Sequence, residues 1–128
     1  MTEKAVASVL VIDDDPTIRL LLVAGLNRQG FRVAEAEDGP SGLETFAREH
    51  PHLVLVDVSM PGMDGYAVVA RMRAMPGGEA LPVLMLTAAD DAETRRLAAE
   101  AGATAVVNKP FQLLPLAEHL RRLLEASA

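Results

Sequence analysis

The sequence predicts an α/β protein of the doubly wound (βα)5 type, with a five-stranded parallel sheet and helices on both faces. Short apolar runs alternate five times with amphipathic segments, which is typical of this architecture. Residues that start and stop helices stand between the runs. Continuous apolar runs bounded by turn formers are typical of strands buried on both faces of a parallel sheet.

The first unit is a strand expected over residues 6–12 and a helix after it. Asp15 is a favoured N-cap and Pro16 a favoured first helical residue, so the helix should begin there and end at Gly30. The predicted buried stripe of this helix has helical spacing and consists of Ile18, Leu21, Leu22, Gly25 and Leu26.

The second and third units follow the same pattern. A strand at 31–35 leads to a helix at 40–49, and a strand that ends at Asp57 leads to a helix at 66–75. Between the last two lies a segment, 59–65, so rich in turn formers that we expect a loop.

The fourth and fifth units complete the sheet. Asp90 or Asp91 is expected to cap a helix that reaches Ala101 and stops at Gly102. The expected bounds are 83–87 and 103–107 for the two strands and 113–125 for the final helix.

Composition limits the function further. The 128 residues suit one domain, 1–128, and the 50% hydrophobic content excludes global disorder. A net charge of −6 argues against direct binding of nucleic acid. There are no cysteines and no apolar stretch long enough for a signal peptide or a membrane span, so we expect a cytoplasmic protein that does not bind membranes.

Polar residues follow four of the predicted strands. Asp13 and Asp14 follow the first, Asp57 ends the third, Thr87 ends the fourth, and Lys109 follows the fifth. Functional residues in such sheets lie past the carboxyl ends of the strands, so these side chains should share one crevice.

Carboxylates held close together repel one another unless a cation intervenes, and Mg²⁺ prefers oxygen ligands. The simpler alternative is that the acids cap a helix N-terminus; we adopt it for Asp15, which precedes Pro16. It is weaker for Asp13 and Asp14, because Asp57 stands at the same end of another strand.

The same residues could carry phosphoryl chemistry. The carboxylate of Asp57 could accept a phosphoryl group, with the hydroxyl of Thr87 and the ammonium of Lys109 binding its oxygens. Each residue alone has an ordinary structural explanation: a loop cap, a strand former and a surface cation. Glycine-rich nucleotide motifs are missing, and Asp57-Val58-Ser59 lacks the second carboxylate of aspartyl-nucleophile phosphatases.

Four motifs stand in order across the chain: Val11-Ile12-Asp13-Asp14-Asp15, Asp57 with Met60-Pro61-Gly62-Met63-Asp64-Gly65, Leu86-Thr87-Ala88, and Lys109-Pro110-Phe111. They resemble the receiver domain of two-component response regulators, of the stand-alone chemotaxis-regulator type with a flavodoxin-like fold. Each is weak alone, but together they are specific.

The resemblance implies a role for each site residue. Asp57 is the implied phosphoacceptor, Thr87 and Lys109 the implied phosphoryl-binding residues, and the Lys109–Pro110 bond is expected to be cis. The implied ligands of Mg²⁺, the one cofactor, are Asp13, Asp14, Asp57 and the backbone carbonyl of Ser59. The protein would be a signalling domain that assists its own phosphorylation and dephosphorylation, not an enzyme acting on a separate substrate.

The resemblance also implies partners. The phosphoryl donor would be a sensor histidine kinase or a histidine phosphotransfer protein, and the output would be contact with an unidentified downstream protein; a phosphorylation-dependent homodimer is left open. Two alternatives stay in view. One is a Mg²⁺-dependent phosphohydrolase on the same fold, and the other is a receiver fragment of a larger transcriptional regulator.

The sequence departs from the receiver pattern at Val106, where receivers commonly carry an aromatic residue, and at Thr104-Ala105, where some carry paired acids. With an aliphatic residue at 106, the signal is expected to travel mainly through Thr87 and the loop after it. The first helix also has more apolar residues than one face can bury, so we expect either an exposed docking surface or cover by the fifth helix.

Overall fold

The computed structural model describes residues 6–89 and 91–127. The strands are β1 (Ser8–Ile12), β2 (Arg32–Ala36), β3 (Leu53–Asp57), β4 (Val83–Thr87) and β5 (Ala105–Asn108). The helices are α1 (Pro16–Arg28), α2 (Gly39–Glu49), α3 (Gly65–Arg73), α4 (Ala92–Ala101) and α5 (Leu113–Ser127).

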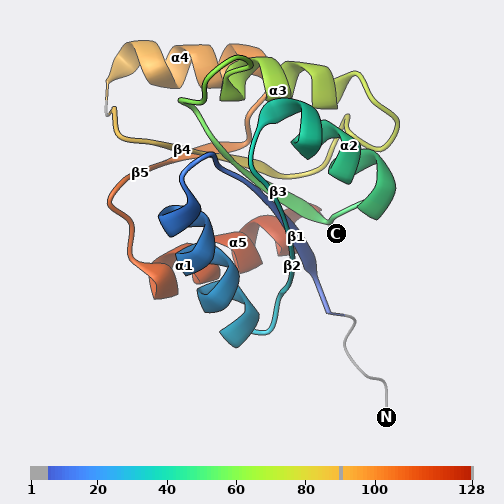
Figure 1. Cartoon of the computed structure of the whole chain (residues 1–128), viewed down its shortest axis with the longest axis vertical. Coiled ribbons are helices and arrows are strands. Elements are labelled where there is room, and N and C mark those ends of the chain that lie inside the picture. Colours follow the sequence, from blue (N-terminus) through green and yellow to red (C-terminus); the bar gives the residue numbers. More distant parts are fainter. Residues whose placement is uncertain (1–5, 90, 128) are drawn as a thin grey trace.

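The five strands form one parallel sheet in the order β2-β1-β3-β4-β5. Helices α1 and α5 cover one face, and α2, α3 and α4 cover the other (Figure 1). Alternate side chains of the central strands supply both cores, since successive side chains of a strand point to opposite faces. The predicted doubly wound (βα)5 fold is confirmed. No helix in the described ranges is both long and apolar enough to cross a bilayer.

Several element ends differ from the predicted ones. The strand predicted at 103–107 runs from Ala105 to Asn108, because the Ala103 N–H donates to the Ala98 carbonyl and still closes the end of α4. The helix predicted to begin at residue 66 begins at Gly65, because the preceding Asp64 is its N-cap. Asp91 caps α4 through the Thr94 N–H at 2.7 Å; Asp90 lies outside the described residues.

The start of α1 follows the prediction closely. Asp15 Oδ1 accepts from the N–H groups of Thr17 and Ile18 at 2.8 and 3.3 Å, which confirms Asp15 as a cap.

The predicted stripe of α1 is wrong at one position. Leu22, Gly25 and Leu26 are buried, but Leu21 is 57% exposed. The reason lies at Gly25, where an added β-carbon would overlap the side chain of Leu113 from α5. This close approach packs α1 against α5 on the side of Gly25, Leu22 and Leu26, and Leu21 lies at the edge of that face.

Arg73 at the end of α3 connects its own helix to the loop before β4 and to the turn after α4, on the α4 side of the sheet. Its guanidinium donates to the carbonyl of Gly102 at 2.8 and 2.9 Å, to that of Gly78 at 2.9 Å and to that of Leu81 at 2.6 Å. Burial lowers the pKa of Arg73. One side chain thus fixes the loop before β4 and the turn after α4.

We expect Arg73→Ala to lower the free energy of unfolding by about 2–4 kcal/mol, because three backbone carbonyls lose charge-assisted hydrogen bonds. Chemical denaturation would measure the change. The matched control is Arg71→Ala, an exposed arginine on the same helix, which should stay within about 0.5 kcal/mol of wild type. Equal effects of the two substitutions would refute the structural role of Arg73.

Candidate phosphoryl and metal site

The strand register brings the predicted site residues to one edge of the sheet. Asp57 pairs with Leu86, which precedes Thr87, and Thr87 itself pairs with Asn108, which precedes Lys109. Asp13 directly follows β1 next to β3. Asp13, Asp57 and Thr87 are buried, whereas Asp14 is exposed. The expected convergence of these residues is confirmed.

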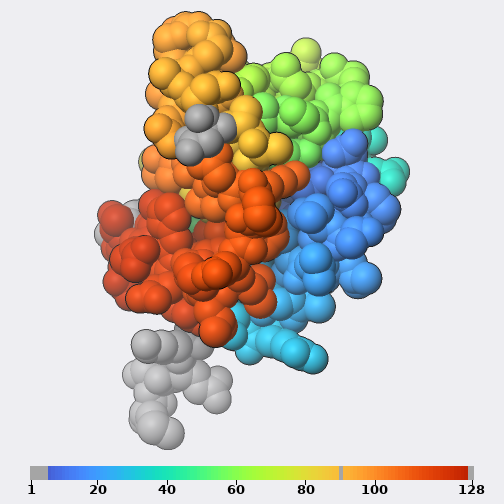
Figure 2. Space-filling model, turned by 90° about the vertical axis from the view of Figure 1, so that its left-hand side faces the viewer, coloured from blue at the N-terminus to red at the C-terminus, as the bar shows by residue number. Residues whose placement is uncertain are grey.

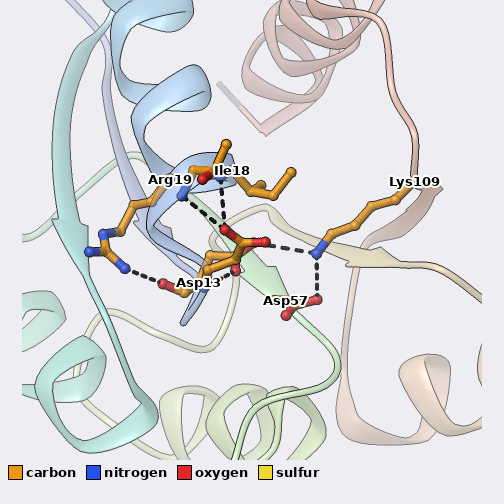
Figure 3. Close-up of polar contacts among 7 residues, drawn as sticks. Asp13, Ile18, Arg19, Asp57 and Lys109 are labelled. Carbon is orange, nitrogen blue, oxygen red and sulfur yellow. Dashed lines mark hydrogen bonds and ion pairs between the residues drawn. The ribbon is translucent and has the colours of Figure 1, made fainter.

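Lys109 lies between two of the carboxylates. Its Nζ is 3.0 Å from Oδ1 of Asp57 and 3.4 Å from Oδ2 of Asp13 (Figure 3). Its backbone N–H donates to the Thr87 carbonyl at 2.7 Å. The peptide bond between Lys109 and Pro110 is cis, as expected.

Burial and charge act against each other at the two central groups. Burial raises the pKa of Asp57, and the charges of Asp13 and Asp14 raise it further, while the hydrogen bond from Lys109 acts the other way. Burial alone would lower the pKa of Lys109, but its hydrogen bond to Asp57 and the charges of Asp13 and Asp57 outweigh burial, so its pKa is raised. The site therefore holds a fixed cation beside a carboxylate that is less easily ionised than usual.

The three acids fit a divalent cation. One carboxylate oxygen from each of Asp13, Asp14 and Asp57 lies within 4.8 Å of the others. Mg²⁺ binds oxygen at about 2.0–2.1 Å and keeps several waters, and a cluster with two buried acids and one exposed acid leaves a side open to water. All donors are hard oxygens, which suits Mg²⁺ better than zinc or copper. Ser59, the fourth implied ligand, is exposed in the loop after β3.

That loop is held close to the end of β3. The Val58 N–H donates to the Leu86 carbonyl and the Gly65 N–H to the Val58 carbonyl, each at 2.9 Å. An added β-carbon at Gly65 would overlap the backbone oxygen of Asp57. Glycine at this position therefore allows α3 to begin directly against the strand end that carries Asp57.

Asp13 is fixed by a residue for which the sequence predicted no role. Arg19 donates to the Asp13 carbonyl at 2.7 Å and pairs with Glu35 Oε1 at 2.9 Å. In Figure 3, Arg19 and Lys109 approach Asp13 from opposite sides. An arginine among the apolar residues in the first half of α1 was the available signal, but its partner on β2 was not evident from the sequence.

Thr87 also has an unpredicted neighbour. Its Oγ1 accepts from the Ala89 N–H at 3.0 Å, and the side chain of Asn108 donates to the Ala89 carbonyl at 3.1 Å. The bond from Ala89 leaves the Thr87 hydroxyl proton available for another acceptor. The loop after β4 is thus tied both to Thr87 and to β5.

A doubly wound sheet with acids, a hydroxyl and a lysine at its carboxyl edge carries the groups that proteins use for phosphoryl transfer. Residues 9–121 match the family described as the response regulator receiver domain. The chain belongs to this family of two-component signalling domains. Receiver domains accept phosphoryl groups and interact with histidine kinases and downstream effectors.

Curated relatives agree with this assignment. The chain is 40% identical over 116 residues to the probable transcriptional regulator ycf27 of Porphyridium aerugineum, covering 91% of this chain and 47% of the relative. It is 38% identical over 120 residues to the response regulator MprA of a Mycobacterium species, strain KMS, covering 94% and 51% respectively. The chain thus spans about half the length of the curated relatives it matches.

Two solved structures share the fold over almost their whole length. The chemotaxis protein CheY4 of Vibrio cholerae superposes with a TM-score of 0.90 at 32% identity, covering 93% of this chain and 99% of that one. The receiver domain of a signal transduction histidine kinase from Syntrophus aciditrophicus superposes with a TM-score of 0.86 at 30% identity, covering 94% and 91%.

Proposed function

We propose that Asp57 is the phosphoacceptor of this receiver domain and that Asp13, Asp14, Asp57 and the Ser59 carbonyl hold Mg²⁺. Thr87 and Lys109 bind the phosphoryl oxygens. The observation that carries the proposal is the placement of Lys109 Nζ within 3.4 Å of both Asp13 and Asp57. A cation held at that point can neutralise the negative charge of the free Asp57 carboxylate and also that of the phosphoryl group once Asp57 carries it.

The transfer forms a bond between a carboxylate oxygen of Asp57 and phosphorus while the bond from phosphorus to the donor's imidazole nitrogen breaks, and the imidazole takes up a proton. Bound Mg²⁺ would neutralise charge on the phosphoryl oxygens. Lys109 supplies a second positive charge that needs no rearrangement, and Thr87 donates a hydrogen bond. The buried position of Asp57 limits water access to its carboxylate.

We also infer that the domain takes up the phosphoryl group stoichiometrically and does not turn over phosphate esters. Incubation with a small acyl phosphate, with and without Mg²⁺, followed by intact mass, tests this. We expect one added phosphoryl group, and only with the metal. Rapid multiple turnover of a phosphate ester would favour the phosphohydrolase instead.

Four further points stay predictions. They are a single domain over residues 1–128, a cytoplasmic location, the state of assembly, and the alternative of a fragment of a larger regulator.

We propose that the histidine donor docks on the exposed part of α1. Leu20 and Leu21 are 68% and 57% exposed, so cover by α5 does not extend to them. Because α1 begins just after the acids, a partner on this surface lies beside the site. Two large exposed apolar side chains at this position favour a protein partner.

Leu20→Asp should slow transfer from a phosphorylated histidine phosphotransfer protein by about tenfold, which corresponds to about 1.4 kcal/mol, and leave labelling by a small acyl phosphate unchanged. Val6→Asp is the matched control, because Val6 is 51% exposed but precedes β1 at the opposite end of the sheet. Parallel time courses with both donors would measure the difference. Equal slowing with both donors would refute the docking site.

A further inference from the structure

The loop after β4 is held at one residue from two sides. The N–H of Ala89 donates to Oγ1 of Thr87 at 3.0 Å, and the carbonyl of Ala89 accepts from Nδ2 of Asn108 at 3.1 Å. A carbonyl oxygen can only accept, so the side-chain atom of Asn108 at this contact has to be the amide nitrogen. Asn108 therefore links the last residue of β5 to the loop that carries Ala89.

The geometry of β5 explains why this link starts at residue 108. Successive side chains of a strand alternate between faces, so residues 106 and 108 share one face. Val106 packs on the core cluster of the α4 side and has no polar group that could bond to the loop. Asn108 is thus the residue on this face of β5 that can hold the loop by a hydrogen bond.

The neighbouring lysine strengthens the same attachment. The backbone N–H of Lys109 donates to the Thr87 carbonyl at 2.7 Å, two residues before the carbonyl that Asn108 holds. Residues 87–89 are therefore attached to residues 108–109 at both ends. Figure 2 shows the side of the molecule where the chain that leaves β4 lies next to the chain that follows β5, between α4 and α5.

We propose that Asn108 is a positioning residue that keeps the Thr87 hydroxyl at the phosphoryl site by restraining Ala89. The inference rests on the role proposed above for Thr87. The Thr87 hydroxyl that would donate to a bound phosphoryl group also accepts a hydrogen bond from the Ala89 N–H. A movement of the Thr87 side chain therefore strains its bond to Ala89. The bond from Asn108 to the Ala89 carbonyl holds Ala89 in place and so opposes that movement. The side-chain amide of Asn108 thus attaches the loop after β4 to β5. Val106, the other residue on this face of β5, is aliphatic and cannot make such a bond.

The test uses the whole chain with Asn108→Ala and Asn108→Leu, which both lack the donor but differ in size. Both variants should speed amide exchange at Ala89 and in the adjoining segment by roughly two- to tenfold, as expected for loss of one hydrogen bond. Both should also slow labelling by a small acyl phosphate, with little change in the unfolding midpoint. The matched control is Asn27→Ala, which replaces an exposed asparagine on α1. It should change neither the amide exchange at Ala89 nor the rate of labelling.

A second experiment, in a Thr87→Val variant, distinguishes a positioning role of Asn108 from a general structural role. In a Thr87→Val background, Asn108→Ala should slow labelling no further, because the hydroxyl that Asn108 positions is gone. Exchange within twofold of wild type, or an equal loss of labelling rate in both backgrounds, would overturn the inference. Failure of wild type to take up any phosphoryl group would instead refute the proposed function, while the exchange measurement would still test the link to Ala89.

Discussion

The Asp57→Asn variant will take up no phosphoryl group from a small acyl phosphate or from a phospho-histidine donor. An amide keeps the shape of the carboxyl but lacks the nucleophilic oxygen that forms the acyl phosphate. Asp13 and Asp14 lie close to Asp57, so the variant also shows whether a neighbouring acid can accept the phosphoryl group instead. Intact mass after saturating treatment with Mg²⁺ measures the result. A variant that is still labelled quantitatively would contradict the assignment of Asp57.

The same substitution is expected to stabilise the protein without metal at neutral pH. The pKa of Asp57 is raised in the fold, mainly by burial, so its contribution to stability is present below the unfolded pKa, about 3.9, and is lost as the pH rises through the raised value. The asparagine variant does not titrate. Its stability advantage over wild type should therefore appear as the pH rises and vanish in acid; a constant difference would contradict the electrostatic cause.

Asp14→Ala is expected to weaken Mg²⁺ binding by roughly a hundredfold or more, because it removes one of three converging carboxylates, which is a larger loss than that of an outer-shell partner. Asp14 is exposed, so the fold should be retained. In wild type, Mg²⁺ at about 100 times its Kd should add about 2.7 kcal/mol to the free energy of unfolding. At the same concentration the variant should gain much less.

The matched control for this prediction is Asp15→Asn. It removes an adjacent negative charge but keeps an N-cap for α1, since asparagine caps helices about as well as aspartate. Asp15 caps the helix through Thr17 and Ile18 and does not belong to the carboxylate cluster. Calorimetric titration of both variants should show near wild-type affinity for Asp15→Asn. Equal losses in the two variants would show that net charge, not coordination by Asp14, governs binding.

The convergence of Asp13, Asp57 and Lys109 could be predicted from the sequence because it needs only parallel strands. Once the apolar runs are parallel strands of one sheet, the residues at their carboxyl ends lie along the same edge, whatever the details of packing. The N-cap at Asp15 was equally predictable, since it depends on local hydrogen bonds alone.

Features that depend on how elements approach one another could not be predicted in this way. Leu21 fits the helical spacing of the buried stripe, but it lies at the edge of the face that packs against α5 and is exposed. Arg19 binds the carbonyl of Asp13 in the loop after β1, and Asn108 binds the carbonyl of Ala89 in the loop after β4. Their roles depend on the path of those loops, for which apolar periodicity gives no signal.

The most direct test of the central claim is to locate the phosphoryl group on the chain. Wild-type protein would be treated with a small acyl phosphate and Mg²⁺, reduced with borohydride, which converts an aspartyl phosphate to homoserine, and digested for peptide mass analysis. We predict one modified residue, Asp57, and no modification when Mg²⁺ is replaced by a chelator. Modification at Asp13 or Asp14, or at Asp57 to the same extent without the metal, would contradict the account.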